Sequence, residues 1–198
     1  MISLIDFDDS FTFNIYSTLK EIFPQVNVDI INKSQALSYL QILADTDDDH
    51  VVILGPGPGH PKEYKEFYAV ISKLLNNKRI YLMGICLGHQ LIWNVLGLEV
   101  SKGSHPIHGQ QVCYRKSKNN FCPPWLEFPL KVQRYNSLAV KVSSSDILKF
   151  NPTYNFFISD GELIMSFSEL LVTYQFHPES VGTYCPAQYF FPLKNILL

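Results

Sequence analysis

Short apolar segments alternate with helical patterns through the first half of this chain, and that alternation constrains its fold more than any other feature. Strands are predicted at residues 2–5, 26–31, 51–54 and 80–85, and helices at residues 11–22, 34–44, 62–76 and 87–96. Asp9 or Ser10 is predicted to cap the first helix. The strands are too apolar to have a solvated face, as is typical of a parallel sheet that helices cover on both sides.

The pattern changes after residue 100. Six further strands are predicted, at residues 111–115, 131–134, 139–142, 156–159, 163–167 and 171–176, joined by loops and by turns such as 159–161. The chain has no repeat, low-complexity tract or linker, and 198 residues suffice for one core. We therefore expect one α/β domain over residues 1–198. It should hold an open, mostly parallel, doubly wound sheet with flanking helices and a small antiparallel β element in its second half.

Charge and cysteine usage exclude several classes of function. Sixteen basic and 18 acidic residues give a formal charge of −2, so no basic surplus would attract nucleic acid or a membrane surface. No apolar run has the length of a membrane span, and Asp6 interrupts the first one too early for a secretory signal. The four cysteines form no C-x-x-C pair. A cytoplasmic protein with reduced thiols is expected.

The segment from Gly84 to Gly88 carries the strongest chemical signal. It lies between a predicted strand and a predicted helix, with Cys86 at its centre. A G-x-nucleophile-x-G turn of this kind presents its central side chain above the sheet. The start of the following helix favours a thiolate, which would lower the pKa of the thiol. An isolated cysteine is more often a buried apolar residue, but the two glycines favour a nucleophile at Cys86.

A second signal is the His177-Pro178-Glu179 segment. In an extended chain residues two apart point to the same side, so the imidazole and the carboxylate can converge. A thiol nucleophile needs a base, and the base needs a partner that holds its tautomer. His177 and Glu179 fit these two roles, although alone such a segment reads as a surface turn.

The third signal is the glycine-rich loop from Gly55 to Gly59, which follows the strand at residues 51–54. That strand should lie beside the strand at residues 80–85, so both following loops open at the carboxyl edge, where ligands bind in such folds. Glycines let backbone N–H groups approach a developing oxyanion. A phosphate-binding loop is the rival interpretation, but the segment lacks the lysine and the serine or threonine of a P-loop.

These motifs together resemble the class I, or triad-type, glutamine amidotransferases, which have a flavodoxin-like sheet. The chain is most similar to the glutaminase subunits of anthranilate synthase and aminodeoxychorismate synthase. The resembling stretches run in the family's order and cover nearly the whole chain: residues 8–14, 55–59, 84–90, 108–109, 134–138 and 175–180.

The resemblance implies a catalytic triad and a reaction. Cys86 would attack the side-chain amide of L-glutamine, His177 would protonate the departing ammonia and then activate water, and Glu179 would orient His177. Ammonia would pass to a chorismate-using synthase partner (component I), either an anthranilate or an aminodeoxychorismate synthase. The resemblance implies no cofactor in this chain, whereas the partner would need Mg²⁺.

The resemblance also implies the residues that hold glutamine. Backbone N–H groups near Gly57 and of Leu87 would form the oxyanion hole. Gln90 would hold the backbone end of glutamine together with the main chain of Ser137 and Leu138. The complete predicted set is Gly57, Pro58, Gly59, Leu87, Gln90, Ser137 and Leu138.

Three positions depart from the family's usual pattern: Phe7, where asparagine is common, Gln110 in place of lysine, and Asn136 in place of histidine. These departures leave two alternatives open besides a glutaminase. One is a binding subunit that keeps the triad but does not deliver ammonia. The other is a γ-glutamyl hydrolase on the same scaffold.

Overall fold

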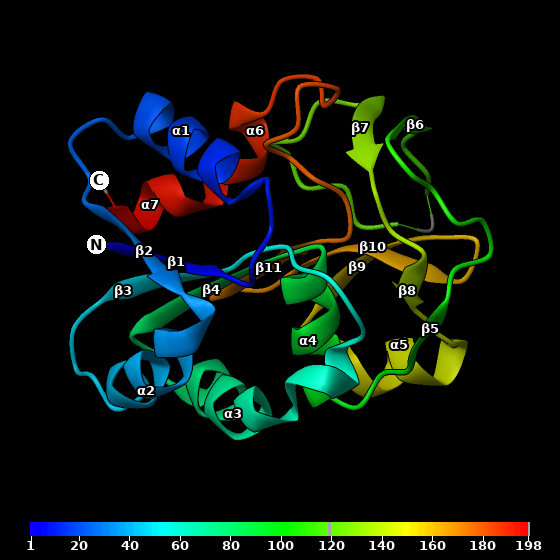
Figure 1. Ribbon diagram of the computed structural model, residues 1–198. Coiled ribbons are helices and arrows are strands. Elements are labelled where there is room, and N and C mark those ends of the chain that lie inside the picture. The colour runs from blue at the N-terminus through cyan, green and yellow to red at the C-terminus, as the bar shows by residue number, and fades with distance from the viewer. Residues whose placement is uncertain (119, 198) are drawn as a thin grey trace.

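The computed structural model describes residues 1–118 and 120–197, and its centre is a seven-stranded sheet between two layers of helices (Figure 1). The strand order is β2-β1-β3-β4-β11-β10-β9. The bounds are β1 Ile2–Asp6, β2 Val28–Asn32, β3 His50–Leu54, β4 Ile80–Ile85, β9 Asn155–Ser159, β10 Glu162–Phe167 and β11 Leu171–Tyr174.

The sheet is mostly parallel, as predicted. β1 pairs in parallel with both β2 and β3, β3 with β4, and β4 with β11, whereas β10 runs antiparallel to its two neighbours. The predicted neighbours, residues 51–54 and 80–85, do lie side by side. The glycine loop and the Cys86 elbow therefore leave the sheet at the same edge.

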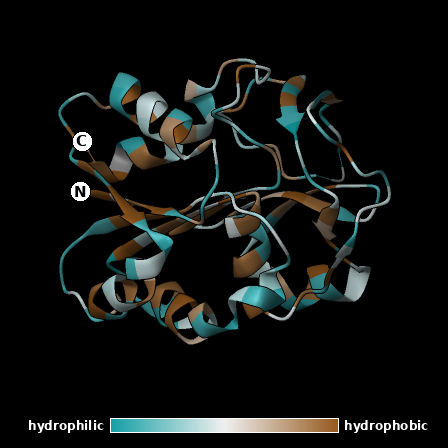
Figure 2. Cartoon of the chain, viewed as in Figure 1, coloured by the Kyte–Doolittle hydropathy of each residue, from teal (hydrophilic) through white to brown (hydrophobic). Residues whose placement is uncertain are grey.

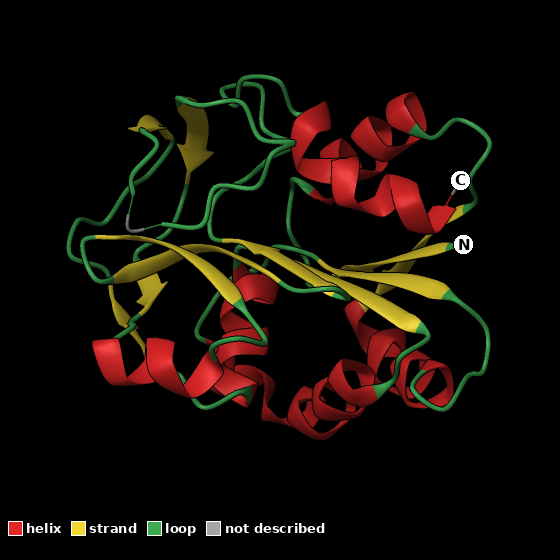
Figure 3. Cartoon of the chain, turned by 180° about the vertical axis from the view of Figure 1, so that it is seen from behind, coloured by secondary structure: helices red, strands yellow, loops and turns green. Residues whose placement is uncertain are grey.

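Helices cover both faces of this sheet (Figures 1 and 3). One face carries α1 (Thr12–Ile22), α6 (Ala187–Phe190) and α7 (Lys194–Leu197), and the other carries α2 (Lys33–Leu43), α3 (Tyr68–Asn76), α4 (Leu87–Val95) and α5 (Ser144–Phe150). Alternate strand residues enter two separate cores. In β3, for example, Val51 and Ile53 pack toward α1, whereas Val52 and Leu54 pack toward α2, α3 and α4. The hydropathy colouring shows the resulting apolar central layer (Figure 2).

Two small antiparallel sheets flank the main one. β5 (Val100–Lys102) pairs with β8 (Leu138–Val140), and β6 (Gln110–Tyr114) pairs with β7 (Leu130–Arg134). This confirms the antiparallel element expected in the second half. We did not predict β5 or α5, although Ser143 and Asp146 form a capping box at the start of α5 that the sequence already contains.

Two helix predictions were wrong in detail. The first helix begins at Thr12 and has no side-chain cap. The Asp9 carboxylate accepts from the N–H of Phe11, the residue before the helix, and not from an N–H group within its first turn. The helix predicted at residues 62–76 is a 3₁₀ helix, Pro61–Phe67, followed by α3, with a kink at Tyr64 (φ −115°, ψ 30°).

Near the C-terminus a 3₁₀ turn, Phe191–Leu193, separates α6 from α7, because Pro192 lacks an N–H for the helical ladder. Across the described residues, no helix has the length and apolarity to cross a membrane.

Candidate active site

Cys86 occupies a strained turn between β4 and α4. Its backbone has φ 51° and ψ −100°, a left-handed conformation that costs a non-glycine residue about 1–3 kcal/mol. The Cys86 N–H donates to the carbonyl of Tyr174 on β11 at 2.8 Å. The thiol is half-buried, so it can meet both the protein interior and a ligand.

Both glycines of the elbow are required by close backbone approach. A Cβ on Gly88 would lie 2.0 Å from the carbonyl oxygen of Leu54, and a Cβ on Gly84 would lie 2.8 Å from the backbone of Gly88. Such distances exclude any side chain at either position. The sequence pattern that marked Cys86 thus follows from the packing of α4 against β3 and β4.

The loop after β11 brings His177 and Glu179 together, as predicted. His177 Nδ1 lies 2.7 Å from Glu179 Oε1, and both side chains are almost fully buried. The backbone of His177 is fixed as well, because its N–H donates to Gln133 at 3.0 Å and its carbonyl accepts from the Thr183 hydroxyl at 2.6 Å. Since a carboxylate only accepts, it holds the proton on Nδ1 and leaves Nε2 for the thiol.

The electrostatics of the ring match this arrangement. Burial alone would lower the pKa of His177. The Cys86 thiolate and Glu179 together outweigh burial and raise the pKa of His177 well above its usual value. Phe11 and Tyr135 pack against the imidazole, with ring centroids 4.9 Å and 5.1 Å away. His177 and Glu179 are therefore paired, and both His177 and Cys86 follow the carboxyl ends of the parallel strands β11 and β4.

A cavity of about 160 Å³ opens beside the thiol. Six of the seven predicted glutamine-binding residues line it, together with Cys86, Tyr135 and Asn136: Gly57, Pro58, Gly59, Gln90, Ser137 and Leu138. The exception is the Leu87 side chain, which is buried. Leu87 is nevertheless adjacent to the glycine loop, since a Cβ on Gly57 would lie 2.6 Å from Leu87 Cδ2.

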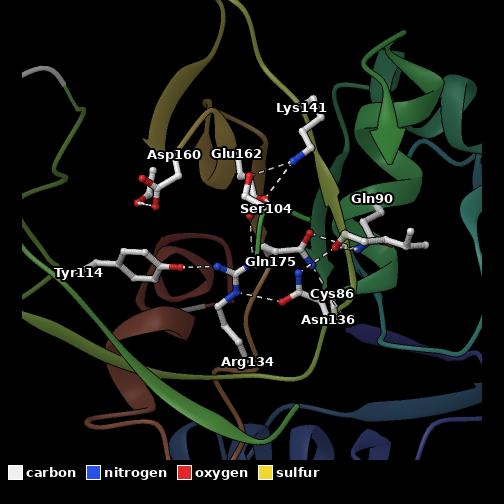
Figure 4. Close-up of polar contacts among 12 residues, drawn as sticks. Cys86, Gln90, Ser104, Tyr114, Arg134, Asn136, Lys141, Asp160, Glu162 and Gln175 are labelled. Carbon is white, nitrogen blue, oxygen red and sulfur yellow. Dashed lines mark hydrogen bonds and ion pairs between the residues drawn. The ribbon is translucent and has the colours of Figure 1, made fainter. Parts of the chain in front are cut away.

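A chain of amide hydrogen bonds runs from the wall of this cavity to the buried side chain of Gln175 (Figure 4). Gln90 Nε2 donates to the carbonyl of Leu138 at 3.0 Å and to Gln175 Oε1 at 3.1 Å. Gln175 Nε2 lies 4.0 Å from the sulfur of Cys86. Asn136 Nδ2 donates to the same Leu138 carbonyl at 2.8 Å. Gln90 and Leu138, both predicted to hold the backbone end of glutamine, are bonded to each other. Gln175 was not among the predicted site residues.

A buried ion pair supports the wall from outside (Figure 4). Arg134 donates from Nε to Asn136 at 2.9 Å and from a terminal nitrogen to Glu162 at 3.3 Å, with both charged side chains only about 5% exposed. Lys141 and the backbone N–H of Ser104 also contact the Glu162 carboxylate, at 3.0 Å and 2.6 Å. Glu162 follows a predicted turn, and no local pattern indicates that it pairs with Arg134, 28 residues earlier.

The three departures from the family pattern have separate structural roles. Phe7 is fully buried between Tyr64 and Phe67 and lies directly under Gly57, so it supports the glycine loop. Asn136 takes part in the cavity wall. Gln110 is exposed on β6.

His89, on α4, is a fully buried hydrogen-bonding residue. Burial lowers the pKa of His89 to about 3, and its Nδ1 lies 2.8 Å from the Thr173 hydroxyl. The ring is therefore neutral. Within residues 1–118 and 120–197, no group of three or more potential metal ligands gathers.

Comparison with known proteins shows the family. The model of the class-I glutamine amidotransferases matches residues 3–193. This chain belongs to that family. Anthranilate synthase component 2 of Cyanophora paradoxa is 33% identical over 189 residues, which cover 92% of each chain. The corresponding protein of Pseudomonas aeruginosa is 33% identical over 190 residues, which cover 92% of this chain and 89% of that protein.

Other relatives of this amidotransferase are longer. The aminodeoxychorismate synthase of Streptomyces pristinaespiralis is 31% identical over 182 residues, which are 91% of this chain and 24% of that protein. The chain thus spans about a quarter of that relative's length. Solved structures share the fold. A Thermoplasma acidophilum protein assigned as part of a GMP synthase gives a TM-score of 0.73 at 19% identity, and the match covers 99% of this chain and 92% of that protein.

Proposed function

We propose that this amidotransferase hydrolyses L-glutamine through Cys86, His177 and Glu179 and delivers ammonia to a chorismate-aminating synthase. The supporting observation is a half-buried thiol that lines a cavity, at the same edge of the sheet as a histidine whose Nδ1 lies 2.7 Å from a carboxylate. The relatives named anthranilate synthase component 2 and aminodeoxychorismate synthase support the choice of partner.

In the proposed first half-reaction, the Cys86 thiolate attacks the side-chain amide carbon of glutamine. Backbone N–H groups near Gly57 and of Leu87 stabilise the resulting oxyanion. His177 gives its proton to the amide nitrogen, the C–N bond breaks, and ammonia leaves a γ-glutamyl thioester on Cys86. Glu179 stabilises the imidazolium and keeps the ring oriented.

In the second half-reaction, neutral His177 takes a proton from water as the hydroxyl attacks the thioester carbon. The C–S bond breaks, glutamate is released and the thiolate returns. Both amide hydrogens of Gln90 already serve Leu138 and Gln175. Gln90 would therefore bind glutamine through its carbonyl oxygen, which can accept from the α-ammonium group.

The proposed partner is the component I synthase of anthranilate or aminodeoxychorismate formation, which would hold chorismate and Mg²⁺. A glutaminase that works alone would waste glutamine. We therefore expect low turnover alone and a rise when the partner binds and reshapes the loop around Gly57. Equal turnover with and without the partner would contradict this regulation.

The test measures glutamate release by the chain mixed with each purified synthase, with glutamine or ammonium as nitrogen donor. Glutamate release should vanish in Cys86→Ala, whereas aminated product formed from ammonium should remain. Full glutamate release by Cys86→Ala would rule the proposal out. Aminated product that forms with ammonium but not with glutamine would indicate a non-delivering subunit. Fast cleavage of γ-glutamyl peptides by the isolated chain would indicate a hydrolase.

A further inference from the structure

Gln175 lies beside the nucleophile because of the strand register. β11 runs parallel to β4 with Tyr174 opposite Ile85, so the next residues along the two strands, Gln175 and Cys86, are also neighbours. The Cys86 N–H continues this pairing by donating to the Tyr174 carbonyl at 2.8 Å, and the Gln175 N–H donates to the Ile164 carbonyl of β10 at 2.9 Å. The Gln175 side chain is completely buried, although an amide is costly to bury without partners.

The hydrogen bonds fix which end of the Gln175 amide faces the sulfur (Figure 4). Gln90 uses its NH₂ group to reach both the Leu138 carbonyl and Gln175, so the atom of Gln175 that it contacts must be an acceptor. The NH₂ group of Gln175 is then the end that lies 4.0 Å from Cys86 Sγ. The Leu138 carbonyl, which cannot donate, sets the orientation of both amides.

We propose that Gln175 donates a hydrogen bond to the Cys86 thiolate, and that Gln90 holds Gln175 in the orientation that makes this possible. The inference deepens the proposed function, because it concerns the same nucleophile. It gives Gln90 a second task besides binding glutamine. A donor that faces the sulfur stabilises the thiolate over the thiol.

The two partners of the sulfur differ in what they do during turnover. His177 gives up its proton to the leaving nitrogen, whereas the Gln175 amide keeps its hydrogens throughout. Gln175 can therefore stabilise the thiolate before attack and again when the thioester breaks. The contact is long even for a sulfur acceptor, so we expect a moderate effect on reactivity.

The test is the rate at which iodoacetamide alkylates Cys86 in the isolated full chain, followed by peptide mass spectrometry. In Gln175→Met, which keeps the length and removes the donor, the rate should fall about three- to tenfold near pH 7. It should converge with wild type at about pH 10, where every thiol is ionised. Gln90→Met should show the same pattern in the absence of glutamine.

Ser166→Ala is the matched control, because Ser166 is a fully buried polar residue that bonds to Thr173 and Trp93 and has no contact with the cavity. It should leave alkylation unchanged. Unchanged rates in Gln175→Met would overturn the inference, as would an equal loss at every pH. If the variants do not fold, the Gln175 side-chain amide signal in wild-type NMR spectra should titrate together with the alkylation rate, and a pH-independent signal would overturn the inference.

These outcomes separate the inference from the proposed function. Neither glutamine nor a partner enters the alkylation assay. Suppose that Gln175→Met lowers the alkylation rate in a pH-dependent way, but that the wild type with its synthase partner hydrolyses no glutamine. This result would reject the proposed function and retain the inference. Full glutamine hydrolysis with alkylation unaffected by Gln175→Met would do the reverse.

Discussion

Replacing Glu162 by glutamine should destabilise the protein far more than removing its more exposed partner, Lys141. The Glu162 and Arg134 side chains are 5% and 6% exposed, whereas Lys141 is 29% exposed. Without the carboxylate, the other side-chain partners of Arg134 are neutral, namely the Tyr114 hydroxyl at 2.8 Å and Asn136 at 2.9 Å. Breaking one side of a buried pair in this way costs about 2–4 kcal/mol.

The matched variant Lys141→Met should cost at most about 1 kcal/mol. The Lys141 ammonium group of the wild type is partly solvated, so its ion pair with Glu162 contributes little to stability. The larger loss matters against a total stability of about 5–15 kcal/mol for a typical protein. The double variant Arg134→Met, Glu162→Met should lose less stability than the two single methionine variants lose together. In the double variant neither member of the Arg134–Glu162 pair is left as an unpaired charge.

The difference between wild type and Glu162→Gln should depend on pH. Burial alone would raise the pKa of Glu162, but hydrogen bonds from Ser104, Lys141 and Arg134 outweigh it and lower the pKa. A group with a lowered folded-state pKa stabilises the protein above its unfolded-state pKa, and this contribution is lost as the pH falls through the folded-state value. The two proteins should therefore approach equal stability in acid.

Urea unfolding followed by circular dichroism, at neutral and acidic pH, measures all of these differences. Equal losses for Glu162→Gln and Lys141→Met at neutral pH would refute the reasoning. A gap between wild type and Glu162→Gln that does not narrow in acid would refute it as well.

Two further predictions concern the elbow and the triad. Gly88→Ala should abolish soluble expression or cost several kcal/mol, because the new Cβ would lie 2.0 Å from the Leu54 carbonyl oxygen; Gly103→Ala, whose Cβ would come no closer than 3.4 Å to its neighbours, is the control. Comparable stability of the two alanine variants would contradict the packing argument. Cys86→Ala should lower the pKa of His177, because the thiolate is the main group that raises it against burial; NMR titration of the imidazole measures this, and an unchanged pKa would mean that the thiol and the ring do not interact.

The sequence alone predicted those parts of the site that depend on residues close together in the chain. The glycines around Cys86 and the two-residue spacing of His177 and Glu179 are visible without a structure, because backbone geometry dictates them over a few residues. The parallel sheet was predictable for the same reason, from short apolar runs that alternate with helical spacing.

What the sequence could not provide is which distant segments meet. The pairing of β11 with β4 puts Gln175 beside Cys86, 89 residues away. The contact between Arg134 and Glu162 likewise depends on how β7 and β10 are placed in space. Hydrophobic patterning fixes which face of a strand is buried but leaves its neighbour open. The kink at Tyr64 was missed because the apolar spacing of the following helix continues through it.

The most direct test of the central claim is to look for the covalent intermediate. The chain is mixed with glutamine and its synthase partner, quenched in acid within the first turnovers, and digested for mass spectrometry. We predict one added glutamyl group on the peptide that carries Cys86, and none in Cys86→Ser. Glutamate release without this adduct, at a rate that Cys86→Ser preserves, would contradict the assignment of Cys86 as the nucleophile.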